Sequence, residues 1–195
     1  MTSIHSTNKK LETVKKEFLD GQVYIALDTE TSGLSHNNDF VIELSAVKFN
    51  CNGIIGEPFS SLIKPPVPVS SFITSLTGIT NIMLRDAPQE ENVLSDFIDF
   101  TEGNKTILIA HNACFDIHFI NAALERTGRK PLKNIFYDTL RMAKIKFPEL
   151  KLTQGTGCYK LENLSETLNI KCGRNHRALS DSLMCMELFK KILLD

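Results

Sequence analysis

This sequence lacks cysteine pairs with the spacing of a metal-binding motif. The five cysteines are odd in number, they are scattered along 195 residues, and they include no C-x-x-C pair. Neither a disulfide framework nor a thiolate zinc site is indicated, and a reducing cytoplasm is the expected location.

Long apolar runs are also absent. The longest, residues 23–27 and 107–110, have the length of a β-strand rather than that of a membrane-spanning helix. The first 20 residues carry four lysines and no continuous apolar segment. We therefore expect no contact with a membrane and no signal peptide.

The net charge of −1 conceals an uneven distribution. Residues 1–125 contain 8 Lys and Arg against 16 Asp and Glu, whereas residues 126–195 contain 14 against 7. A protein that holds phosphates with one region and metal cations with another would show this pattern. Charges that fell unevenly on a solvated surface would show it too, so the counts alone do not decide.

The hydrophobic pattern predicts strands and helices in alternation. Strands are expected at residues 23–28, 41–50, 106–110 and 135–138, with a further strand that follows a hairpin at Asn52-Gly53 and ends near Ile63. Helices are expected at residues 8–20, 71–77, 90–100, 113–126, 139–146, 160–169 and 178–194, and residues 148–159 are expected to form a loop. The chain length suits one core, so we predict a single α/β domain with a mixed β-sheet.

Two acids lie at the end of the first apolar strand. Asp28 and Glu30 are two residues apart, so the pleat of a strand directs both side chains to the same face. Adjacent carboxylates in an apolar setting resist ionising unless a cation lies between them, which indicates a divalent metal site. The alternative is that one of them caps the turn at Thr31-Ser32-Gly33.

Two further segments carry candidate residues. Asp116 lies early in the predicted helix that follows the strand at 106–110, where it either joins a site at the sheet edge or favours the positive end of that helix. His176 and Asp181 are five residues apart, about 140° around a helix, so His176 is better placed on the loop that enters the last helix. A mobile base beside a fixed metal ligand would suit this arrangement. The alternative is a helix cap and a surface acid.

Together these segments resemble the motifs of the DEDDh 3′→5′ exonuclease superfamily, in particular its polymerase-proofreading branch. The matching segments are Asp28-Thr29-Glu30-Thr31-Ser32-Gly33-Leu34, Ala110-His111-Asn112-Ala113-Cys114-Phe115-Asp116, and His176 with Asp181. The resemblance covers about residues 22–190 and implies a ribonuclease-H-like fold, a central mixed β-sheet flanked by helices. Residues 1–21 would then be an N-terminal helical extension and residues 22–195 the exonuclease domain.

The resemblance also implies the chemistry. Two divalent cations, Mg²⁺ or Mn²⁺, would be held by Asp28, Glu30, Asp116 and Asp181, with His176 as the general base. The implied reaction hydrolyses the terminal phosphodiester at the 3′ end of single-stranded DNA and releases nucleoside 5′-monophosphates, in proofreading or repair.

Substrate contacts are implied at several positions. Thr31 and Leu34 would line the pocket for the terminal nucleotide, with Leu34 as a wedge. His111, Asn112 and Phe115 are weaker candidates for contact with the strand, and Phe115 is as readily a core residue. Three basic residues near the third motif either contact phosphates or belong to a solvated loop: Lys171, Arg174 and Arg177.

Two other functions compete with this interpretation. A 3′→5′ exoribonuclease or oligoribonuclease would use the same five residues, because these motifs do not distinguish RNA from DNA. A non-catalytic, polymerase-associated nucleic-acid-binding module would keep the fold, but the presence of all five residues argues against it. A DNA polymerase is a candidate partner. Only 14 residues follow Asp181, so we expect a free-standing exonuclease, or a subunit that docks through its folded surface, rather than one tethered by a C-terminal tail.

Overall fold

One mixed β-sheet organises the computed structural model, which describes residues 9–102, 106–170 and 177–195. Within these residues, six strands form a sheet in the order β3-β2-β1-β5-β6, and β4 also pairs with β2. The strands are β1 Tyr24–Thr31, β2 Val41–Asn50, β3 Gly53–Ile54, β4 Phe59–Leu62, β5 Ile107–Ala110 and β6 Phe136–Asp138. Central β1 is antiparallel to β2 and parallel to β5, which is parallel to β6.

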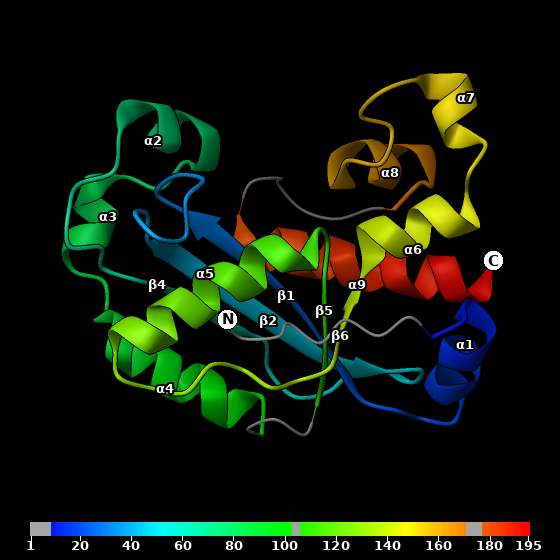
Figure 1. The fold of residues 1–195 in the computed structure, drawn as a ribbon, viewed down its shortest axis with the longest axis horizontal. Coiled ribbons are helices and arrows are strands. Elements are labelled where there is room, and N and C mark those ends of the chain that lie inside the picture. Colours follow the sequence, from blue (N-terminus) through cyan, green and yellow to red (C-terminus); the bar gives the residue numbers. More distant parts are fainter. Residues whose placement is uncertain (1–8, 103–105, 171–176) are drawn as a thin grey trace.

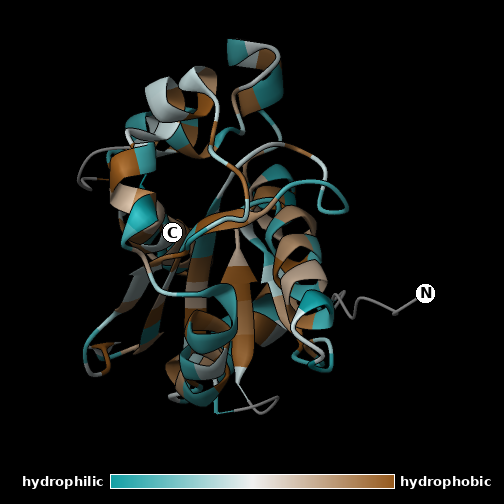
Figure 2. Cartoon of the chain, turned by 90° about the vertical axis from the view of Figure 1, so that its left-hand side faces the viewer, coloured by the Kyte–Doolittle hydropathy of each residue, from teal (hydrophilic) through white to brown (hydrophobic). Residues whose placement is uncertain are grey.

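Helices cover both faces of the sheet (Figures 1 and 2). They are α1 Leu11–Leu19, α2 Ser71–Thr77, α3 Asn81–Arg85, α4 Glu90–Phe100, α5 Ala113–Arg126, α6 Thr139–Lys146, α7 Leu150–Gln154, α8 Leu161–Thr167 and α9 Ala178–Leu194. The core on one face is shared with α4 and α5, and the core on the other with α1, α6, α8 and α9. The predicted α/β fold with a mixed sheet between helices is confirmed. No helix in the described part of the chain combines the length and hydropathy needed to cross a membrane.

Burial on both faces explains why β1 begins as an apolar run. Tyr24 and Ala26 belong to the core on the α9 face, whereas Ile25 and Leu27 belong to the core on the α5 face. Because side chains alternate along a strand, residues 28 and 30 continue the α9 face and residue 29 continues the α5 face. The strand therefore presents its two acids to α9.

Most predicted elements lie where the sequence placed them, with three differences. The short helix α3 was not predicted; the Thr80 hydroxyl, which accepts the Met83 N–H, caps its start. The predicted loop at 148–159 contains α7, which anchors one buried side chain, Leu150, before Gly155 ends it. The strand after the hairpin is divided into β3 and β4, with Gly56 at a φ of 70° between them.

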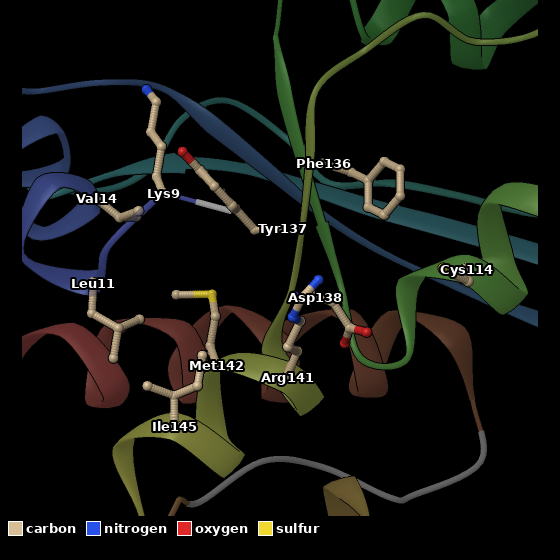
Figure 3. A pocket seen from close by; sticks show the side chains of 10 residues that line it. All are labelled: Lys9, Leu11, Val14, Cys114, Phe136, Tyr137, Asp138, Arg141, Met142 and Ile145. Carbon is tan, nitrogen blue, oxygen red and sulfur yellow. The ribbon is translucent and has the colours of Figure 1, made fainter. Parts of the chain in front are cut away.

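Helix α1 packs into the core rather than lying apart from it. The Phe18 ring is buried, with its centroid 6.0 Å from that of Phe189 on α9 and 6.4 Å from that of Phe49 on β2. Leu11 and Val14 line a small pocket of about 170 Å³ that α6 borders (Figure 3). The division of the chain at residue 21 stays a prediction, but α1 and the sheet share one core.

We expect Phe18→Ala to lower the free energy of unfolding by about 3 to 5 kcal/mol, because it removes a fully buried ring. Urea denaturation followed by circular dichroism measures this. Leu19→Ala is the matched control, since Leu19 is 54% exposed and its truncation should change the value by at most about 0.5 kcal/mol. Equal, small effects from both variants would show that α1 is a detachable extension.

Candidate active site

Three carboxylates converge where β1 meets the start of α9. Asp28 and Glu30 of β1 and Asp181 in the first turn of α9 each offer an oxygen, and these oxygens all lie within 4.8 Å of one another. We call these three residues the carboxylate cluster. The Ser182 hydroxyl, near the start of α9, lies 2.7 Å from the Ala178 carbonyl oxygen of its own helix and 3.1 Å from the Ser45 carbonyl oxygen of β2. The start of α9 is therefore fixed against the sheet beside the two acids of β1.

Asp116 approaches the cluster from the opposite layer. It lies in the first turn of α5 and is almost fully buried. The backbone N–H and the hydroxyl of Thr29 both donate to its Oδ1, at 3.0 and 2.7 Å. Thr29 sits between Asp28 and Glu30 on β1, so a single residue connects Asp116 to the strand that carries the other two acids.

Burial and mutual repulsion make these carboxyl groups hard to ionise. Burial raises the pKa of Asp28 well above its ordinary value, and repulsion by Asp116, Asp181 and Glu30 raises it further. Burial, followed by repulsion from Asp181, raises the pKa of Glu30 to about 8. Burial also raises the pKa of Asp116 to about 7, although the hydrogen bonds from Thr29 oppose the shift.

The donor set suits a hard divalent cation. All the donors are carboxylate oxygens, which favour Mg²⁺, Mn²⁺ or Ca²⁺ over zinc. Crowded, partly buried carboxylates with raised pKa values need a nearby positive charge to ionise together. A divalent cation among the oxygens of the cluster would supply it.

Glu43 is a further acid beside Glu30, and the charge of Glu43 is balanced by Arg177. It lies opposite Glu30 on β2 and is 2% exposed. Arg177 donates to Glu43 through both Nε and a terminal nitrogen, the shortest contact being 2.6 Å, and the Ala178 N–H donates to it at 3.0 Å. This ion pair fixes Arg177, the residue that precedes α9. The Arg177 guanidinium is also close enough to Glu30 to lower its pKa slightly.

The chain matches a known protein family over most of its length. Residues 25–189 match the model of the exonuclease family RNase_T, and this span contains the cluster, Asp116 and the start of α9. The chain belongs to the exonuclease family. The prediction made from the three motifs is confirmed at this level.

Relatives of this exonuclease domain include bacterial replication proteins. It is 39% identical over 170 residues to the DNA polymerase III subunit epsilon of Treponema pallidum, covering 87% of this chain and 76% of that protein. It is 39% identical over 175 residues to the PolC-type DNA polymerase III of Caldanaerobacter subterraneus subsp. tengcongensis, covering 90% of this chain. The chain spans only 12% of the length of that polymerase.

Solved structures of exonuclease I share the fold. The E. coli enzyme in complex with a dT13 oligonucleotide superposes with a TM-score of 0.75 at 19% identity, over 89% of this chain and 41% of that one. A zinc-bound form of the E. coli enzyme with single-stranded DNA superposes with a TM-score of 0.72 at 20% identity, over 88% and 42%. These similarities confirm the predicted ribonuclease-H-like fold.

The turn after β1 is held by residues other than the two acids. The Asp39 carboxylate accepts the Ser35 N–H, the Ser32 hydroxyl accepts the Phe40 N–H, and the Thr31 hydroxyl donates to the Gly33 carbonyl. The alternative role of Asp28 or Glu30 as a turn cap therefore has no support in these contacts. Leu34 projects from the same turn and is 87% exposed.

The other predicted substrate residues differ in their surroundings. Both ring nitrogens of His111 are engaged, Nδ1 with the Thr139 hydroxyl at 3.0 Å and Nε2 with the Tyr159 carbonyl at 2.9 Å. Asn112 is exposed in a left-handed conformation, φ 65°, at the start of α5. Phe115 is partly buried against the core, with its ring tilted by 45° to that of Phe119 and the ring centroids 4.8 Å apart, as the core alternative predicts.

The predicted general base His176 lies outside the described residues, as do Lys171 and Arg174. Arg177 lies within them, and its guanidinium binds Glu43 instead of lying unpaired in a solvated loop. Sequence reasoning missed the supporting residues Thr29 and Glu43. An acid in the middle of a buried strand, as in Ile42-Glu43-Leu44, was a signal that could have identified the second.

We expect the metal-free protein to lose stability as the pH rises. The folded pKa of Glu30, about 8, lies above its ordinary value of 4.5, so the folded state holds more protons between these values. The stabilisation is present below pH 4.5 and is lost as the pH passes through about 8. Melting temperatures in EDTA should fall over this interval, and Mg²⁺ should restore them at the alkaline end. If Glu30→Gln gives the same pH slope as the wild type, Glu30 is not the titrating group.

Removing Arg177 should destabilise the protein more than removing the whole ion pair. Arg177→Ala leaves the buried Glu43 carboxylate without its main partner, at a cost of about 1.5 to 3 kcal/mol, discounted because 45% of the Arg177 side chain is exposed. The double variant with Glu43→Gln should recover part of this loss. Chemical denaturation of both single variants and the double variant measures the coupling. Strictly additive losses would contradict a direct interaction.

Proposed function

We propose that this chain is a divalent-cation-dependent 3′→5′ exonuclease that hydrolyses the terminal phosphodiester of single-stranded DNA. The observation that carries the proposal is the convergence of the Asp28, Glu30 and Asp181 oxygens within 4.8 Å in a chain that matches the exonuclease family over residues 25–189. Asp116 is held beside them by Thr29. These four residues are the acids implied by the motif pattern.

Mg²⁺ or Mn²⁺ are the cations we propose for the site, held by Asp28, Glu30, Asp116 and Asp181. Bound there, they would supply Lewis acidity for the attacking water and for the leaving oxygen. The zinc-bound form of E. coli exonuclease I shows that a structural neighbour binds a divalent metal. The oxygen-only donors of this chain favour harder ions.

The protein's own groups complete the reaction. His176, with an ordinary pKa of about 6.5, would take a proton from the attacking water near neutral pH. The water oxygen bonds to phosphorus, the bond from phosphorus to the 3′ oxygen of the preceding nucleotide breaks, and that oxygen leaves with a proton. A nucleoside 5′-monophosphate is released.

Leu34 is the best supported of the proposed contacts with the terminal nucleotide. Leu34 is 87% exposed on a turn that three side-chain hydrogen bonds hold, four residues after Glu30, so it offers an accessible apolar side chain. Thr31 is the last residue of β1, and its hydroxyl already donates to the Gly33 carbonyl of the turn. Asn112 and Phe115 flank the start of α5, where Asn112 is the more accessible.

The relatives suggest a role in replication. In the PolC-type relatives the matched segment is a small part of a polymerase chain, and the epsilon relative is named as a subunit of DNA polymerase III. We therefore propose a DNA polymerase as a partner and proofreading or repair as the process. The cytoplasmic location stays a prediction from the cysteine pattern.

Digestion of matched 5′-labelled single-stranded DNA and RNA tests the function. We expect a ladder of shortened DNA in Mg²⁺ or Mn²⁺, none in EDTA, and none for Asp28→Ala. Asp96→Ala, which removes an exposed acid on α4, should digest like the wild type. His176→Ala should slow turnover by about 10²- to 10⁴-fold while metal affinity is kept.

Other outcomes would redirect the proposal. A preference for RNA would identify an exoribonuclease, and binding without cleavage of either strand would identify a non-catalytic module. An equal loss of metal affinity and turnover in His176→Ala would remove that residue from the role of general base.

A further inference from the structure

A groove of about 460 Å³ opens beside the carboxylate cluster. It lies between the β5–α5 junction, α6 and residues 157–161. We call it the basic groove, and the lining residues that matter here are His111, Asn112, Leu140, Lys144, Tyr159 and Lys160. Its volume is in the range of small-ligand sites, about 300 to 1,000 Å³.

The sheet places this groove next to the cluster. Strand β5 runs parallel to β1 with Ile109 paired to Ala26, so His111 and Asp28 each follow two residues later at the same edge. The Thr139 hydroxyl lies 3.0 Å from His111 Nδ1 and 3.6 Å from the Sγ of Cys185, which is one helical turn beyond Asp181 on α9. Contacts through Thr139 and Cys185 thus connect the wall of the groove to the helix α9 that carries Asp181.

Hydrogen bonds hold the walls of the groove in place. His111 links the β5–α5 junction to Tyr159 through its Nε2, and the Tyr159 hydroxyl donates to the Phe147 carbonyl at 2.7 Å. The Asp138 carboxylate accepts the N–H groups of Asn112 and Leu140. With both ring nitrogens engaged, His111 acts as a positioning residue that fixes the wall.

The accessible charges in the groove are positive. Lys144 and Lys160 are both exposed, and neither forms a salt bridge with a carboxylate among residues 9–102, 106–170 and 177–195. The partly buried Leu140 and Leu161 supply apolar surface between them, and Asn112 offers an exposed amide. Two ammonium groups around a partly apolar groove suit a ligand with repeated phosphates and flat bases.

We propose that the basic groove binds the backbone of single-stranded DNA immediately upstream of the bond that is cut. The proposal rests on the proposed function. With the terminal phosphodiester at the carboxylate cluster, the strand continues into the groove, where Lys144 and Lys160 contact the preceding phosphates. Longer strands therefore bind more tightly than a single nucleotide unit does.

Binding and turnover are measured separately to test this. The first probe is a 5′-fluorescein single-stranded DNA of about 12 nucleotides, and its binding in Ca²⁺ is followed by anisotropy. The second probe is the p-nitrophenyl ester of thymidine 5′-monophosphate, a substrate with one nucleotide unit. The test variant is Lys144→Ala/Lys160→Ala. Lys16→Ala/Lys130→Ala removes the same charge from exposed positions outside the groove, and Lys144→Arg/Lys160→Arg keeps the charge.

We expect the test variant to bind the oligonucleotide about tenfold more weakly. The slope of log Kd against log salt should fall by about 1.4, because two phosphate contacts are lost and each contributes about 0.7. Its loss of kcat/KM on the oligonucleotide should exceed its loss on the ester about tenfold. The Arg variant should restore binding, and the control pair should bind like the wild type. An unchanged salt slope, or an equal loss in the control pair, would overturn the proposal. If the wild type cleaves neither probe, the proposed function fails while the binding data still decide the role of the groove.

Discussion

Asp28 and Glu30 lie two residues apart on a strand that is covered on both faces, so their charges can be neither separated nor fully hydrated. Asp181, Asp116 and Glu43 approach the same point from α9, α5 and β2. Such crowding raises the pKa values of the acids and would destabilise the ionised fold. The surrounding structure is best understood as the means by which these acids are held together in spite of their repulsion.

Each acid meets this constraint differently. Glu43 has a permanent counter-charge in Arg177, and Asp116 has two hydrogen bonds from Thr29. For the carboxylate cluster, the counter-charge we propose is a shared divalent cation. The repulsion among these acids would lower the stability of the metal-free protein, and a bound cation would remove that penalty. Such an arrangement is expected where metal affinity matters more than the stability of the metal-free protein.

The sequence predicted the strands and most helices because these depend on local periodicity. The meeting of Asp28 and Glu30 with Asp116 and Asp181 was implied only by the resemblance to an exonuclease family. The pleat alone puts Asp28 and Glu30 on one face, and the alternation of burial along β1 determines that this face meets α9. Thr29, Glu43 and the engaged ring of His111 could not be predicted in the same way. Their roles depend on partners 87, 134 and 28 residues away, respectively, which no local pattern specifies.

This arrangement offers an explanation for the uneven distribution of charge between residues 1–125 and residues 126–195. A cluster of carboxylates repels a polyanionic strand, so neutralising the cluster with cations removes the repulsion but gives little attraction beyond the terminal phosphate. Attraction over a longer stretch of strand requires positive charge outside the metal site. The basic groove is formed mostly by residues of the basic segment 126–195, whereas Asp28, Glu30, Glu43 and Asp116 belong to the acidic segment 1–125. The parallel pairing of β1 with β5 and of β5 with β6 brings these two segments together at one edge of the sheet.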